Sequence, residues 1–88
     1  MPSIKEHNPK EIIDATGLKC PMPVIKLQQA VRKLAEGEIV SIIFTDPGAE
    51  KDIKMWSKIN RHHVIESLEE QTQALTSYQI FIKVKSTS

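Results

Sequence analysis

The sequence predicts an α+β fold, a two-layer α/β sandwich in which two helices cover one face of a four-stranded mixed sheet. The 88 residues leave room for one small domain. Apolar residues switch along the chain between a period of two and steps of three and four, which indicates strands alternating with helices. Their order is β-α-β-α-β-β, and placing both helices on one face of the sheet is the economical way to bury them.

The first strand and the first helix are predicted on either side of a short connection. Residues 11–15 have the apolar content of a short strand, and Gly17 in the connection can adopt backbone angles that other residues avoid. From Pro21 the apolar residues recur at helical spacing. This stripe is formed by Val24, Leu27, Ala30, Val31 and Leu34. Gly37 is the expected end of this helix.

The next segment predicts a central strand followed by a second helix. Residues 39–45 are rich in β-branched and aromatic side chains without alternation, which is typical of a strand buried on both faces. Asp46 is a suitable N-cap for the second helix, with Pro47 at its first position and Glu50 in its first turn. The expected inward stripe consists of Ala49, Ile53, Trp56 and Ile59.

Two further strands are predicted at the end of the chain. Residues 64–68 form the third strand, and residues 71–77 are a polar connection. Residues 78–84 alternate with the clearest period of two in the sequence. The side facing the helices then carries Tyr78, Ile80, Ile82 and Val84, which leaves Phe81 on the open side of the sheet.

The domain organisation follows from these elements. We expect a flexible leader at residues 1–10, a single domain at residues 11–85 and a tail at residues 86–88. No apolar run approaches the roughly 20 residues that span a bilayer, and the polar N-terminus lacks the apolar core of a signal peptide. The net charge of +1 argues against a strongly basic nucleic-acid arm. These features predict a cytoplasmic protein without a membrane partner.

Cys20 is the residue on which the functional interpretation depends. A single cysteine forms neither an internal disulfide nor a multi-thiolate metal site, and we expect no metal or other cofactor. If Cys20 is the N-cap, Pro21 and Pro23 lie in the first turn, where they remove no helical hydrogen bond. The helix dipole and Lys19 would then lower the pKa of the thiol.

Two interpretations of Cys20 follow, a reactive thiol or an inert N-cap. Position 23 is a proline, so a redox pair of the Cys-x-x-Cys type is excluded. A cysteine protease would need a histidine base, and the chain offers only His7, His62 and His63. A thiol that accepts a group and passes it to another protein needs no deep cleft, so a carrier is favoured.

The residues around Cys20 resemble those of a known family. Residues 14–24 (Asp-Ala-Thr-Gly-Leu-Lys-Cys-Pro-Met-Pro-Val), with Gly37-Glu38, Asp46-Pro47 and Asp52-Ile53, closely resemble the TusA/SirA-like sulfur-carrier family. The resemblance covers about residues 11–85. It implies a fold like that of the C-terminal domain of translation initiation factor three.

The resemblance also implies a function. Cys20 would accept sulfane sulfur as a persulfide from a cysteine desulfurase or a rhodanese and pass it to an acceptor protein. In the best-known branch the sulfur reaches 2-thiouridine in tRNA; other branches serve molybdenum-cofactor synthesis, sulfur oxidation or a suspected selenium pathway. Members of the tRNA branch often carry an acidic residue where this chain has Met22 and can carry a second cysteine in the second helix. His62 matches a histidine that members often show after that helix, which makes it a possible auxiliary residue.

Other interpretations stay open from the sequence. The second helix carries a basic stripe of Lys51, Lys54, Lys58 and Arg61, which is either a solvated face or a landing site for an acidic partner or tRNA. The alternative function is a non-catalytic RNA- or protein-binding module with an inert Cys20. Haem sensing through the Cys-Pro pair is a third and minor possibility. We expect a monomer, because the thiol must be handed between partners.

Overall fold

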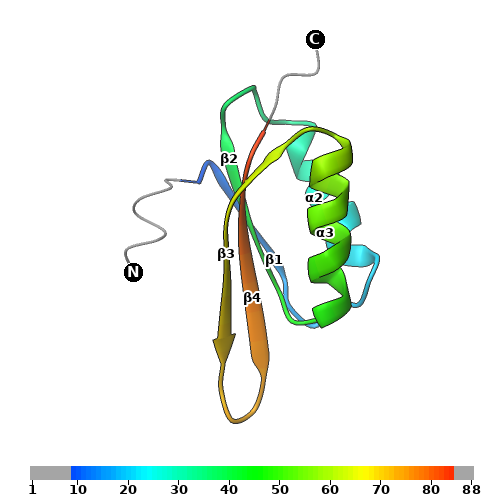
Figure 1. The fold of residues 1–88 in the computed structure, drawn as a ribbon, viewed down its shortest axis with the longest axis vertical. Helices are drawn as coiled ribbons and strands as arrows, with labels where there is room; N and C mark the ends of the chain where they lie inside the picture. Colours follow the sequence, from blue (N-terminus) through cyan, green and yellow to red (C-terminus); the bar gives the residue numbers. More distant parts are fainter. Residues whose placement is uncertain (1–8, 85–88) are drawn as a thin grey trace.

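The four strands form one sheet, and the two helices lie side by side on one of its faces (Figure 1). The computed structural model describes residues 9–84. Its elements are β1 (Glu11–Ala15), α2 (Met22–Val31), β2 (Ile39–Phe44), α3 (Pro47–Ile59), β3 (His63–Gln71) and β4 (Thr76–Lys83). The strand order is β1-β2-β4-β3, with β1 parallel to β2 and the other neighbours antiparallel. The predicted fold class is confirmed.

The core lies between this sheet and the helices. β2 pairs with a strand on each side, and its Val40, Ile42 and Phe44 are fully buried toward the helices. Leu27 of α2 and Ile53 of α3 are fully buried in the same cluster. Burying a side chain of this size stabilises the fold by about 1.5–3 kcal/mol. This core fixes both helices against the sheet and so fixes the loops at their ends.

α3 begins where the sequence predicts, and α2 ends earlier than predicted. The Asp46 side chain caps α3 by accepting a hydrogen bond from the Gly48 N–H at 3.0 Å. α2 ends at Val31. The Arg32 N–H still bonds the Gln28 carbonyl, but the N–H groups of Lys33 and Leu34 bond carbonyls only three residues back. Leu34 still packs against the core from the turn after the helix.

The hairpin of β3 and β4 is longer than expected, and its connection is only residues 72–75. β3 was underestimated because it is a polar edge strand, and a register shift between Val64 and Glu66 interrupts its alternation. Figure 1 shows the hairpin extending past the end of the helical layer. It leaves Leu75, in the connection, exposed.

Two predicted burial assignments are wrong. Ile59, expected to face inward, is 71% exposed, because the buried stripe of α3 runs through Ala49, Ile53 and Ser57 instead. Phe81, expected on an open face, is fully buried. It lies on an internal strand, flanked by Ser41 of β2 and Glu66 of β3. The open face of the sheet therefore loses the exposed aromatic residue that would have favoured a binding surface there.

The ends of the chain fall outside this description. The predicted leader lies mostly, and the predicted tail wholly, beyond residues 9–84, as does His7, so the domain boundaries stay predictions. Neither helix of the described part is long and apolar enough to cross a membrane.

Candidate functional site

Cys20 lies in the connection between β1 and α2, and its side chain is exposed. The Cys20–Pro21 peptide bond is cis. Cys20 is not the N-cap of α2, contrary to the prediction. The Pro21 carbonyl accepts the first helical hydrogen bond, from the Ile25 N–H at 3.1 Å, which makes Pro21 the N-cap. The thiol therefore lies one residue outside the helix.

The two prolines of the motif have different environments. Pro21 is exposed, whereas Pro23, in the first turn of α2, is fully buried. Neither disturbs the helix, because the first N–H groups of a helix have no partner within it. The burial and the fixed φ angle of Pro23 restrict the first turn of α2. Pro23 thereby holds the adjoining Cys20 connection in place.

The rest of the connection is held by hydrogen bonds to its neighbours. Gly17 has a φ of +79°, which a residue with a side chain rarely adopts, and its N–H donates to Thr45 Oγ1 at 2.9 Å. Thr16 donates from both its N–H and its hydroxyl to Asp14 Oδ1, at 3.0 and 2.7 Å. Lys19, next to Cys20, is exposed. These bonds fix the path of the chain that leads to the thiol.

Two carboxylates of the α3 region bind Cys20. The Cys20 N–H donates to Asp46 Oδ2 at 2.7 Å, while the other oxygen of Asp46 caps α3. The Cys20 thiol donates to Asp52 Oδ2. Both acceptors come from a segment more than 25 residues further along the chain. The start of α3 therefore contacts Cys20 through its backbone and through its sulfur.

These contacts reverse the predicted effect on the thiol. The hydrogen bond to Asp52, with smaller effects of burial and of the Asp52 and Asp46 charges, raises the pKa of Cys20. The prediction failed because the thiol donates a hydrogen bond to the Asp52 carboxylate, a contact that the sequence did not reveal. The Cys20 and Gly48 N–H groups, with a smaller contribution from Lys19, lower the pKa of Asp46. Lys19 thus acts on the capping carboxylate.

Asp52 was not predicted as a hydrogen-bond partner of Cys20. One signal in the sequence was its place in the Asp52-Ile53 pair of the family resemblance. Its position was also informative, since an acidic residue early in a helix lies near the loop that packs on that end. Asp46 was predicted only as the N-cap of the second helix, and not as the acceptor of the Cys20 N–H.

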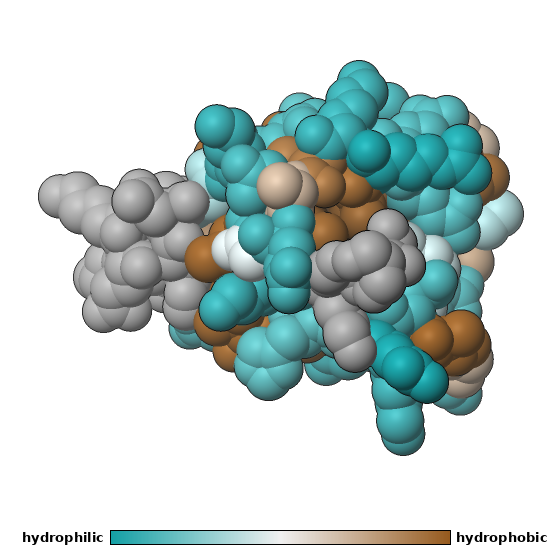
Figure 2. Space-filling model, turned by 90° about the horizontal axis from the view of Figure 1, so that it is seen from above, coloured by the Kyte–Doolittle hydropathy of each residue, from teal (hydrophilic) through white to brown (hydrophobic). Residues whose placement is uncertain are grey.

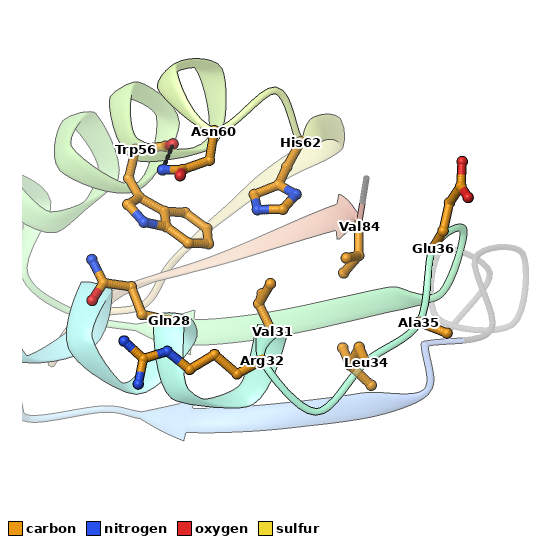
Figure 3. A pocket seen from close by; sticks show the side chains of 10 residues that line it. All are labelled: Gln28, Val31, Arg32, Leu34, Ala35, Glu36, Trp56, Asn60, His62 and Val84. Atoms are coloured by element: carbon orange, nitrogen blue, oxygen red, sulfur yellow. Dashed lines mark hydrogen bonds between the residues drawn. The ribbon is translucent and has the colours of Figure 1, made fainter. Parts of the chain in front are cut away.

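The structure does not bring His62 to the thiol. After Asp52, α3 continues for seven residues, about 10 Å, before it ends at Ile59, and His62 follows that end. Its ring packs against Trp56, with 5.0 Å between centroids and 37° between planes (Figure 3). Partial burial lowers the pKa of His62. Its position therefore fits packing better than sulfur chemistry.

His62 and Trp56 line a hollow at the C-terminal ends of the helices. Its volume is about 730 Å³, and Val31, Leu34 and Val84 supply its apolar side chains (Figure 3). Viewed from this end, the molecule shows apolar surface framed by hydrophilic side chains (Figure 2). This hollow and the Cys20 site lie at opposite ends of the helical layer.

The predicted basic stripe is exposed, as a solvated face would be, but Arg61 follows the end of α3 and does not lie on the helix. Lys51, Lys58 and Arg61 are exposed. Lys54 pairs with Glu50 at 3.1 Å, an i,i+4 pair on the helix surface. Such pairs contribute only about 0.3–0.5 kcal/mol. Cys20 is the one cysteine of the sequence, and its exposed side chain makes its thiol accessible to partners.

The family model and the curated relatives agree on one family for this chain. Residues 11–84 match the family model described as sulfurtransferase TusA. The sulfur carrier protein TusA of Pseudomonas putida is 40% identical over 65 residues, which cover 74% of this chain and 81% of the relative. The sulfur carrier protein TusA of Pseudomonas aeruginosa is 42% identical over 64 residues, which cover 73% and 81%.

A solved structure shows the same fold. The SirA-like protein from Desulfitobacterium hafniense superposes with a TM-score of 0.67 at 21% identity. The match covers 86% of this chain and 99% of that one. At this identity the likeness is one of fold.

Proposed function

The chain belongs to the sulfurtransferase TusA family, and on this premise we propose that its sulfur-carrier role is performed by the Sγ atom of Cys20. The observation that carries the proposal is the exposed thiol in the Cys-Pro-Met-Pro segment of residues 20–23. An inert, packed cysteine would be buried, as free cysteines usually are. The thiol is exposed near the start of a helix and not in a deep cleft, so that donor and acceptor proteins can contact the sulfur atom directly.

The proposed reaction is the transfer of one sulfane sulfur atom. The Cys20 thiolate attacks the outer sulfur of a donor persulfide, so that a bond forms between Sγ and this sulfur while the S–S bond of the donor breaks. The bonding electron pair stays on the donor cysteine, which leaves as a thiolate and takes up the proton that Cys20 has lost. No oxidant or reductant is consumed. Transfer to the acceptor repeats the step with Cys20 as the leaving thiolate.

The partners follow from this chemistry. The donor is a protein that carries a persulfide, a cysteine desulfurase or a rhodanese, and the acceptor is a second thiol protein. We place the reaction in the cytoplasm, with a monomeric carrier, and connect it to tRNA 2-thiouridine synthesis or a related sulfur pathway. Met22, 44% exposed beside the thiol, offers an acceptor an apolar contact where the tRNA branch often has an acidic residue.

Intact-mass spectrometry tests this function. The chain is incubated with a cysteine desulfurase and cysteine, or with a rhodanese and thiosulfate. We expect an adduct of about 32 Da that reduction removes and that the C20S variant does not form, since only the thiolate is the nucleophile. Circular dichroism of C20S should match the original chain, because the side chain is exposed. An adduct that persists in C20S, or no adduct with either donor, would contradict the proposal.

A further inference from the structure

The hydrogen bond between Cys20 and Asp52 suggests how the carrier is kept inactive between partners. We infer that Asp52 holds the Cys20 side chain in its protonated thiol form in the free carrier, and that a docked partner releases the thiolate by offering a lysine or arginine side chain to Asp52. The inference rests on the proposed sulfur-carrier function. It makes Asp52 a positioning residue, which acts through Cys20.

The first step of the argument is the geometry at the sulfur. A thiol has a proton to donate to the Asp52 carboxylate, and the structure shows this hydrogen bond. A thiolate has no proton, so the same contact would become a repulsion between two anions. Asp46 adds a second negative charge, because its Oδ2 lies 2.7 Å from the Cys20 nitrogen. The two carboxylates therefore favour the thiol over the thiolate.

The second step concerns the cations near the site. Lys19 is adjacent to Cys20 in sequence, and its charge acts on Asp46. Lys26 of α2 acts on Asp14. Within residues 9–84 the ion pairs are Lys10–Glu38 and Lys54–Glu50, so no cation there neutralises Asp52. The negative charge beside the sulfur is thus left for a partner to neutralise.

The third step is the consequence for sulfur transfer. The thiol is a weak nucleophile, so the free carrier reacts slowly with small electrophiles and oxidants. When a partner's ammonium or guanidinium group pairs with Asp52, the hydrogen bond is lost and the Sγ proton passes to water. The thiolate then forms in contact with the bound donor. The same arrangement favours partners with a basic residue next to their reactive cysteine.

The first experiment measures the alkylation rate of the free, full-length chain by iodoacetamide as a function of pH. D52N should shift the midpoint of the profile to lower pH and raise the rate at pH 7, by about tenfold for each unit of pKa. The matched control is E50Q, which removes the same charge from α3 but contacts Lys54 and Ser67, away from the sulfur. We expect its profile to match that of the original chain. An unchanged or upward-shifted midpoint in D52N would overturn the inference.

The second experiment compares donors. Inorganic polysulfide, which brings no cation, should load D52N faster than the original chain. A cysteine desulfurase with cysteine should load D52N no faster, because its cation has lost the carboxylate it pairs with. If D52N were loaded faster than the original chain by both donors to the same extent, the proposed release of the thiolate by a partner's cation would be wrong. If no donor loads the original chain while the alkylation midpoint of D52N still shifts, the carrier function and the role of the partner both fail, and only the hold of Asp52 on the thiol stands.

Discussion

The two ends of the helical layer use the same two helices for different purposes. At the N-terminal ends, Cys20 is exposed and donates hydrogen bonds to the carboxylates of Asp46 and Asp52. At the C-terminal ends, Trp56 and His62 pack ring against ring over apolar side chains. Charge and hydrogen bonds determine the state of the thiol at the first end, whereas buried apolar contacts contribute stability at the second end. Reactivity and stability are therefore separable along one layer of the structure.

α3 connects these two ends. Its buried stripe of Ala49, Ile53 and Ser57 fixes the helix on the sheet. Asp52 and Trp56 follow one another by one turn on a neighbouring face, so that one points to the thiol and the other to the hollow. A change at Asp52 should therefore alter reactivity with little effect on stability, and a change at Trp56 should do the opposite.

Truncation of Trp56 should give the largest effect on stability. Trp56 is partly buried against the core and contacts His62, so W56A should lower the free energy of unfolding by about 2–3 kcal/mol, less than for a fully buried tryptophan. Denaturant unfolding followed by circular dichroism measures this loss. The neighbouring M55A, which truncates a side chain that is 51% exposed, is the matched control and should change stability little. If folded W56A no longer accepted sulfur, the two ends would not be separable.

Removal of the Asp46 side chain should have a smaller effect, felt at both α3 and Cys20. D46A removes the N-cap of α3 and the acceptor of the Cys20 N–H, and loss of a cap costs about 1 kcal/mol. D46N keeps a capping oxygen and should restore most of this stability. Denaturant unfolding compares the two variants. If D46N were as unstable as D46A, the contribution of Asp46 would lie in its charge, and the capping interpretation would be wrong.

The sequence predicts the fold better than it predicts the site. Apolar patterning predicts the order and approximate position of the strands and helices, and Asp46-Pro47 marks the start of α3, because these signals act between residues close in the chain. The contact of Cys20 with Asp52 joins residues 32 positions apart, and no local pattern records it. The thiol was therefore assigned the effect of the nearest helix and lysine, although the carboxylate of another helix has the larger effect. The exposure of Ile59 and Phe81 was mispredicted for a related reason, since burial depends on which neighbours the sheet and helices supply.

His62 should give the smallest effect, which appears only as a dependence of stability on pH. Partial burial lowers its pKa from 6.5, so the unfolded chain binds the proton more tightly than the folded one. The contribution of neutral His62 to the stability of the fold is complete above pH 6.5. It is lost as the pH falls from 6.5 through the lower pKa that His62 has in the folded chain. H62Q should remove this part of the acid sensitivity, as measured by denaturant midpoints at neutral and mildly acidic pH. The matched control H63Q changes the adjacent, exposed histidine and should leave the acid sensitivity of stability unchanged. If H62Q left the acid dependence intact but shifted the alkylation profile of Cys20, His62 would belong to the thiol site after all, and the division between the two ends would fail.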